Sequence, residues 1–212
     1  MKRTILSLVT IITLAVCASH FASAQTPLGY WRFNEGSGTT AGDGVGSNDG
    51  TLGFGAGWSA SGGGRSGVGG DYSLNLGAYN NGARVVVDAS NMFLNHAGAS
   101  DQLTMSFWQR TKETAARSAS YFWITSPAAS AGFRGAQAHV PWGNGGGTVF
   151  WDTQSCCGGT GRITAGGQGG LLRNTQWHHL AFVKNGGLRQ IWIDGTLGGA
   201  GGGGSALTDF TE

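Results

Sequence analysis

The sequence predicts an all-β domain with many turns, and its composition is the first reason. The chain has 212 residues, of which 41 are Gly, 13 are basic and 11 are acidic, whereas an average domain carries about 7% Gly and about 25% charged residues. Collagen is excluded, because the glycines follow no three-residue period and only three Pro occur. Eight Trp, ten Phe and four Tyr provide ample surface to bury, which is unlike a disordered chain.

Short apolar runs between turn-forming clusters are the second reason. Most are rich in Val, Ile, Phe, Trp or Thr, which suit a pleated strand, and they cover residues 28–33, 72–76, 83–87, 103–110, 121–125, 148–152, 177–184 and 188–194. In the run 103–110, Leu103, Met105 and Phe107 are apolar at every second position, and Trp108 adds apolar weight to the other face. Such a strand is expected between two layers. We therefore expect the tryptophans on strands to be core residues, namely Trp31, Trp108, Trp177 and Trp192.

Two dipeptides predict tight reversals between strands. Asn185-Gly186 and Asp194-Gly195 both tolerate the positive φ angles of a hairpin turn. Residues 36–70 are rich in Gly and Ser and predict one long loop that follows a surface. A helical turn is expected only around residues 88–96. No closing strand is expected after Leu197, where the chain becomes largely Gly.

The first 24 residues predict a secretory signal peptide. Lys2 and Arg3 form the positive segment, residues 5–16 are mostly apolar, and residues 22–24 read Ala-Ser-Ala, a cleavage site. The apolar stretch is shorter than the roughly 20 residues that a membrane anchor needs. A lipoprotein modified at Cys17 is an alternative, although the preceding Val16 is large for that position. The domain then comprises residues 25–212, and we expect it outside the cell, on the cell surface or in the periplasm.

Removal of the signal peptide leaves a nearly neutral chain, because Lys2 and Arg3 account for the excess of basic residues. The chain has no basic stripe to bind nucleic acid or an anionic membrane surface. We also expect no transmembrane segment after the signal peptide.

Several segments, in order, match the pattern of one known family. They are YWRFNEGSG at 30–38, DGVGSNDGTL at 43–52, LTMSFW at 103–108, and WHHLAFV at 177–183 followed by IWIDG at 191–195. Together they resemble the bacterial laminin-G-like jelly-roll family of the concanavalin A-like lectin/glucanase group. Residues 134–142, 149–153 and 156–157 resemble a subset of secreted bacterial members. The resemblance covers about residues 28–197.

This resemblance implies a two-sheet antiparallel jelly-roll sandwich, here without the strands that normally close it beside the first strand. An unpaired edge of that kind promotes aggregation. It also implies a secreted, non-catalytic module that binds a glycan or an extracellular protein, for example in cell adhesion. Two other functions remain open, a glycoside hydrolase-like or hydrolase-appended domain and a structural spacer of a larger surface protein.

Candidate ligand-binding residues gather around one loop tryptophan. Trp142 lies in a Pro-Trp-Gly-Asn-Gly loop and can offer its apolar face to a sugar ring, with His139, Asn144 and Asp152 as hydrogen-bonding partners. The alternative is that Trp142 folds back over the core.

A calcium site is the candidate for a metal. Asp43, Asn48 and Asp49 provide hard oxygen ligands on a Gly-rich loop, and backbone carbonyls could complete the shell. Some relatives of this fold bind a structural Ca²⁺. The alternative is plain turn formation, which Asp, Asn and Gly favour in any case.

Cys156 and Cys157 are adjacent, and an oxidising compartment favours a disulfide between them. Neighbouring Cα atoms are 3.8 Å apart, closer than the 4.4–6.8 Å that disulfides prefer. Such a bridge would be strained, would stiffen its loop and would contribute little stability by closing so short a loop. Free thiols and intermolecular bonds are the alternatives.

Three other patterns are set aside. Two Gly-x-Gly-x-x-Gly matches, starting at Gly62 and Gly199, do not stand between a strand and a helix, as nucleotide binding requires. His178 and His179 are adjacent on a predicted strand and point to opposite faces, so they cannot share a zinc ion. Glycoside hydrolysis usually needs two carboxyl groups, and no Glu-x-Asp pair lies on any predicted strand, so Asp152 stands alone beside Trp151.

Overall fold

The computed structural model describes residues 26–78, 81–87, 100–111, 120–124, 133–140, 147–155 and 161–202. Its elements are β1 (Thr40–Ala41), β2 (Gly50–Gly53), β3 (Gly57–Trp58), β4 (Leu74–Asn75), β5 (Arg84–Val87), β6 (Gln102–Gln109), β7 (Phe122–Ile124), β8 (Phe133–His139), β9 (Val149–Ser155), β10 (Arg162–Ala165), α2 (Gly169–Leu172), β11 (His178–Asn185), β12 (Leu188–Ile193) and β13 (Thr196–Gly201). The described part of the chain contains no helix that is long and apolar enough to cross a membrane. The helical turn predicted at residues 88–96 lies outside the described residues.

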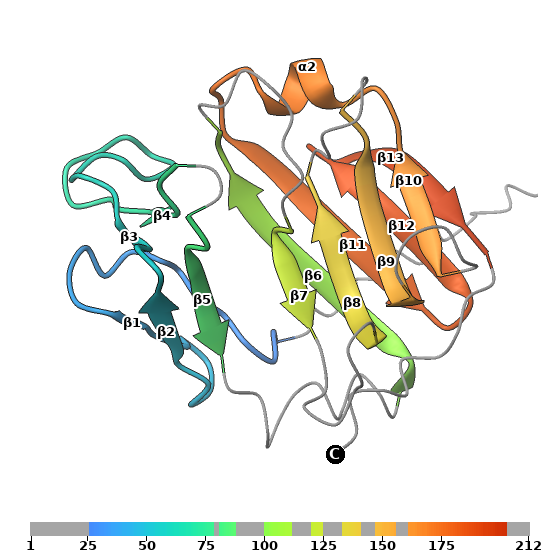
Figure 1. The fold of residues 1–212 in the computed structure, drawn as a ribbon, viewed down its shortest axis with the longest axis horizontal. Helices are drawn as coiled ribbons and strands as arrows, with labels where there is room; N and C mark the ends of the chain where they lie inside the picture. Colours follow the sequence, from blue (N-terminus) through green and yellow to red (C-terminus); the bar gives the residue numbers. More distant parts are fainter. Residues whose placement is uncertain are drawn as a thin grey trace, which may run out of the picture.

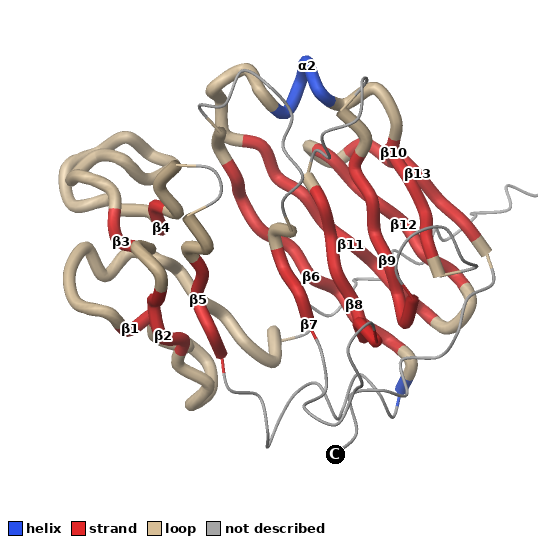
Figure 2. Tube along the Cα trace, viewed as in Figure 1, coloured by secondary structure: helices blue, strands red, loops and turns tan. Residues whose placement is uncertain are grey.

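Two four-stranded sheets face each other and form a sandwich (Figures 1 and 2). Sheet A has the strand order β10-β9-β8-β7, and sheet B has the order β13-β12-β11-β6. All neighbouring strands in both sheets are antiparallel. The predicted all-β, two-sheet antiparallel sandwich is confirmed.

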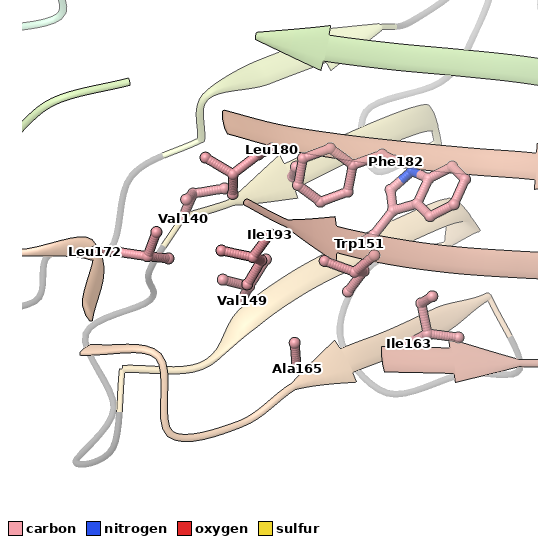
Figure 3. Close-up of a cluster of buried hydrophobic side chains, with 11 residues drawn as sticks. Val140, Val149, Trp151, Ile163, Ala165, Leu172, Leu180, Phe182 and Ile193 are labelled. Atoms are coloured by element: carbon pink, nitrogen blue, oxygen red, sulfur yellow. The ribbon is translucent and has the colours of Figure 1, made fainter. Parts of the chain in front are cut away.

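The hydrophobic core lies between the inward faces of the two sheets (Figure 3). Val149 and Trp151 of β9 point inward and are fully buried, as are Leu180 and Phe182 of β11. The rings of Trp151 and Phe182 meet edge to face, with their centroids 5.9 Å apart. Full burial of one large apolar side chain contributes about 1.5–3 kcal/mol, so these contacts hold the two sheets together.

The two predicted reversals are confirmed. Gly186, with a φ of +54°, lies in the turn between β11 and β12. Asp194 and Gly195 have φ angles of +49° and +78° and connect β12 to β13. Positive φ is accessible to Gly and tolerated by Asp, which is why these dipeptides end the strands here.

The sequence did not predict β13, whereas the expected absence of a closing strand beside the first strand stays a prediction. β13 pairs with β12 from Thr196 to Gly201. Its glycines allow close packing on β10, because a Cβ at Gly199 would overlap the carbonyl oxygen of Thr164. The two sheets therefore come together along the side formed by β10 and β13.

The expectation that Trp108 belongs to the core is wrong. The inward positions of β6 include Leu103 and Phe107, so the alternation of the strand turns Trp108 outward, where 47% of its surface is exposed. Trp31, Trp177 and Trp192 are half-buried.

The region before β6 forms two small sheets of its own, which lie beside β6 and β7 in Figure 1. β1, β2 and β5 form one sheet, and β3 and β4 form the other. The segment 36–70, expected to be a single loop, thus contains three short strands. The strand predicted at residues 28–33 is reduced to an isolated bridge between Trp31 and Asp43.

Two cationic side chains point into the sandwich at one end of sheet B. Lys184 and Arg189 stand opposite each other on β11 and β12, and they expose only 1% and 2% of their surface. Lys184 Nζ donates hydrogen bonds to Asp101 Oδ1 at 2.5 Å and to the carbonyl oxygen of Gly186 at 2.7 Å. Burial lowers the pKa of the Arg189 guanidinium, and the attraction of Asp152 opposes this effect. A buried charge is tolerated when it is paired, so Asp101 compensates the burial of Lys184.

Replacement of Asp101 by Ala should destabilise the protein by about 3 kcal/mol, because it removes the counter-ion of a buried ammonium group. Lys184→Met, which removes the charge and keeps an unbranched apolar chain, should cost less. Asp101→Asn removes the charge without adding backbone strain, because Asn also tolerates the φ of +52° at this position. It therefore separates the two effects that Asp101→Ala combines. Urea denaturation followed by circular dichroism measures all three losses, and equal losses in Asp101→Ala and Lys184→Met would contradict this account.

Candidate functional site

Two of the four predicted ligand-binding residues, His139 and Asp152, lie on the outer face of sheet A. Their neighbours Ala138 and Trp151 belong to the core, and successive side chains of a strand point to opposite faces. His139 Nε2 lies 3.9 Å from Asp152 Oδ2. The structure therefore brings these two side chains together.

Four residues form a row across this face, one from each strand of sheet A. Trp123 stands opposite Gln137, and Gln137 stands opposite Asp152. Asp152 in turn stands opposite Arg162. Because directly opposite residues share one face of a sheet, these side chains are neighbours, and we call the four residues the cross-strand row.

Asp152 is the centre of the cross-strand row and is fully buried. Its Oδ1 accepts a hydrogen bond from Arg162 Nε at 2.5 Å. Its Oδ2 accepts hydrogen bonds from Arg162 Nη2 and from Gln137 Nε2, both at 2.7 Å. The hydrogen bonds from Arg162 to this carboxylate raise the pKa of the guanidinium, against the opposing effect of burial. Asp152 thus holds Arg162 by a bidentate ion pair, whose planar fork fixes the guanidinium in one orientation.

Arg162 and His139 also share an aromatic neighbour. The Arg162 guanidinium lies 4.4 Å from the centre of the Phe150 ring, and the His139 ring meets the same Phe150 ring at a centroid distance of 6.4 Å. His139 Nδ1 lies 3.3 Å from Ser120 Oγ. The outer face of sheet A is therefore ordered by polar and aromatic contacts.

Exposure differs sharply along the cross-strand row. The indole of Trp123 is 55% exposed, whereas Gln137 and Asp152 are fully buried. The side chain of Arg162 is 20% exposed at the other end. A ligand can therefore reach Trp123 and the edge of Arg162 directly, and the buried Asp152 positions Arg162.

The predicted calcium loop is organised by hydrogen bonds from the backbone. Asp43 Oδ1 accepts from the N–H groups of Tyr30 at 2.9 Å and Val45 at 3.2 Å, and Oδ2 accepts from that of Asn48 at 3.3 Å. Asp49 Oδ1 accepts from the N–H of Asp43 at 2.8 Å. Burial raises the pKa of Asp43, but the backbone donors together outweigh it and leave the pKa below its ordinary value.

These hydrogen bonds match the turn-forming alternative for the loop. Among the described residues there is no group of three or more His, Cys, Asp or Glu that could hold a metal ion. Calcium also binds amide and backbone carbonyl oxygens. A calcium site at Asp43, Asn48 and Asp49 stays a prediction.

His178 and His179 point to opposite faces of sheet B, as predicted. His178 is buried, with Nδ1 2.7 Å from Asp194 Oδ2 and Nε2 2.9 Å from Asn174 Oδ1. His179 lies outside against Trp108, with ring centroids 5.2 Å apart. The two imidazoles cannot ligate one ion.

The remaining predicted residues, Trp142, Asn144, Cys156 and Cys157, lie outside the described residues. Their proposed roles in ligand binding and in a disulfide stay predictions.

Sequence reasoning missed Trp123, Gln137 and Arg162. A signal existed for Gln137, because it alternates with two alanines that face the core, Ala136 and Ala138. Gln137 stands opposite Asp152 because β8 pairs with β9, and the two side chains are hydrogen-bonded although they are 15 positions apart in the sequence. Composition does not reveal this contact.

One family comparison is positive. The laminin-G-like family of the concanavalin A-like lectin/glucanases superfamily matches residues 80–212, which is more than half of the chain. The chain belongs to this family. The resemblance inferred from the sequence is confirmed, and no curated protein or solved structure matches the chain.

In this laminin-G-like domain, the described groups around Asp152 are hydrogen-bonding and charged groups. The groups that the structure places on Asp152 are an amide, a guanidinium and, at longer range, an imidazole. Hydrolysis of a glycosidic bond usually requires a second carboxyl group within about 5–10 Å. Asp152 is engaged as the counter-ion of Arg162, which suits a positioning residue.

Asp152→Asn should destabilise the laminin-G-like domain by about 2–4 kcal/mol, because it leaves the half-buried Arg162 without its counter-ion. Thr164→Val is the matched control, since Thr164 is exposed on the same face and should stay within about 0.5 kcal/mol. Thermal and urea denaturation measure both changes. A fully stable Asp152→Asn variant would show that the ion pair contributes nothing.

The pH dependence of stability tests the Asp43 loop. Since the pKa of Asp43 is lower in the folded chain than its ordinary 3.8, its ionised form stabilises the fold above that pH, and this contribution disappears as the pH falls through the folded pKa. Asp43→Asn should therefore be less stable than the wild type at neutral pH, and the difference should shrink toward about pH 2. A difference that stays constant with pH would contradict the role of the charge.

The same two proteins, melted in Ca²⁺ and in EDTA, test the calcium prediction.

Proposed function

We propose that this domain is a non-catalytic recognition module that works outside the cytoplasm and binds a glycan on the outer face of sheet A. The observation that supports it best is the exposure of Trp123, which is 55% accessible, on the same face as buried polar groups that are hydrogen-bonded to one another. Trp is highly buried on average, and exposed aromatic anchors are typical of binding surfaces. The location rests on the predicted signal peptide at residues 1–24.

In the proposed mechanism, the apolar face of a sugar ring lies against the indole of Trp123. Burial of both apolar surfaces from water supplies the affinity. The exposed Thr164 and the accessible edge of Arg162 can hydrogen-bond to hydroxyl groups. Trp142 and Asn144, as predicted from the sequence, would add a second aromatic face and an amide.

The buried residues act indirectly in this mechanism. Asp152 and Gln137 hold Arg162, and His139 packs against Phe150. A surface that is already ordered loses less conformational entropy when it binds. These three residues are therefore positioning residues.

Trp123→Ala should lower the affinity for the bound glycan at least about tenfold, because tryptophan anchors commonly contribute 2 kcal/mol or more. A glycan array on the full chain identifies the ligand, and isothermal titration then compares the variants. Tyr30→Ala is the matched control, since the Tyr30 side chain is similarly exposed but lies before β1, outside sheet A. Trp142→Ala tests the sequence-predicted platform in the same assay.

The outcomes separate the proposed functions. Unchanged affinity in Trp123→Ala would reject this site on sheet A. A blank array from folded protein would favour protein docking or a spacer role. Turnover of an oligosaccharide that is lost in Asp152→Asn would favour the hydrolase alternative.

A further inference from the structure

A second group of residues lies on the opposite sheet of the sandwich and combines two arginines with two tryptophans. His179 stands opposite Trp108 between β11 and β6, and Trp177 and Arg110 lie directly beyond the last pair of these strands, His178 and Gln109. The guanidinium of Arg110 lies 4.9 Å from the centre of the Trp177 ring. The guanidinium of Arg65, from the region before β6, lies 4.7 Å from the centre of the Trp108 ring. We call Arg65, Arg110, Trp108, Trp177 and His179 the Arg–Trp cluster.

The loop that carries Arg65 is fastened to this face. Arg110 Nη2 donates a hydrogen bond to the carbonyl oxygen of Gly63 at 3.1 Å. Two residues beyond Gly63, Arg65 reaches Trp108, which lies two residues before Arg110. The two guanidinium groups are thus brought to one place by contacts between segments more than 40 residues apart in the sequence.

Among the described residues, neither Arg65 nor Arg110 forms an ion pair. Hydrogen bonds from Ser66 lower the pKa of the nearby Asp71, and the charge of Arg65 adds to this effect at longer range. Two carboxylates lie in the surroundings and are occupied by other donors. Asp71 accepts from the backbone and hydroxyl of Ser66, and Asp194 accepts from His178 and from the N–H of His179.

Most hydrogen-bond donors of the two guanidinium groups remain available. An arginine has five N–H donors, and Arg110 uses one of them within the described residues, whereas Arg65 uses none. A guanidinium that lies over an indole keeps its N–H edge directed away from the ring. Its orientation is set in advance, so less entropy is lost when it binds a carboxylate or sulfate through two parallel hydrogen bonds.

We infer that the Arg–Trp cluster binds the anionic substituents of an acidic saccharide. The shared chemistry is a negatively charged oxygen group, either a uronate carboxylate or a sulfate ester, on a sugar ring. Arg65 and Arg110 hold the charged oxygens, and the half-exposed indole of Trp108 contacts the apolar part of the ring. This inference extends the proposed glycan recognition to a second site, on the sheet opposite Trp123.

A saccharide fits this cluster better than a nucleic acid. Nucleic-acid binding relies on many phosphate contacts from a basic surface, whereas the whole chain has 13 basic and 11 acidic residues. Two fixed guanidinium groups beside an indole suit a few discrete charges on a ring-shaped ligand.

The test measures binding of the full chain to oligogalacturonate, to sulfated dextran oligosaccharides and to neutral dextran, in EDTA to remove any effect of calcium. At least one acidic probe should bind more tightly than the neutral one, and the one that binds identifies the charged group. The double variant Arg65→Gln/Arg110→Gln should lose at least tenfold in affinity, because each charge-assisted hydrogen bond contributes strongly. Glutamine keeps an amide that can still donate to Gly63, and thermal melting checks that the variant is folded.

The matched control is Arg84→Gln/Arg173→Gln, which removes the same charge elsewhere. Arg84 lies over the Phe54 ring, and Arg173 Nε donates to the carbonyl oxygen of Gly169. This control should bind the acidic probe as the wild type does, and so should Trp123→Ala. No binding of either acidic probe, equal losses in both double variants, or unchanged binding in Arg65→Gln/Arg110→Gln would overturn the inference. Loss of acidic-probe binding in Trp123→Ala alone would assign that ligand to sheet A and would also overturn it.

Discussion

The contact between Trp151 of sheet A and Phe182 of sheet B is the constraint on which the rest of the structure depends. Both side chains are fully buried, and Phe107 and Phe122 pack against Phe182. Because side chains alternate along a strand, the direction of these two rings decides the direction of all their neighbours. Asp152 then faces outward on sheet A, and His179 faces outward on sheet B. Both candidate binding surfaces are consequences of how the core is filled.

The two outer faces use cationic side chains in different ways. On sheet A, Arg162 is neutralised by Asp152 and ordered further by Phe150. A buried ion pair of this kind contributes little net stability, since desolvation offsets most of the attraction, but it fixes the orientation of Arg162. On sheet B, Arg65 and Arg110 lie over indole rings, and no carboxylate in the described part of the chain forms an ion pair with either. That arrangement preserves their charge for a ligand, and it suits the recognition of an anion.

Sequence patterns predicted the long strands well and the short ones poorly. β6, β11 and β12 have strong apolar alternation, β11 and β12 also end at turn dipeptides, and the structure confirms all three strands. β13 was missed because its glycines have no side-chain pattern, although their small size is what allows it to approach β10. Within the site, His139 and Asp152 were predicted, whereas Trp123 and Arg162 were not. Their importance comes from standing on the same face as Asp152, and strand register is not visible in a single sequence.

The sequence by itself determined the fold class, the family, the two tight turns and the nearly neutral charge, because these depend on composition and on local spacing. The tertiary structure alone decided which face of each strand is buried. A period of two is compatible with either face, and the choice on β6 placed Trp108 outside rather than in the core. It also decided the long-range neighbours, such as Arg65 over Trp108 and Arg162 on Asp152. These contacts arise because pairing of the strands and packing of the sheets bring together residues whose separation in the sequence gives no sign of it.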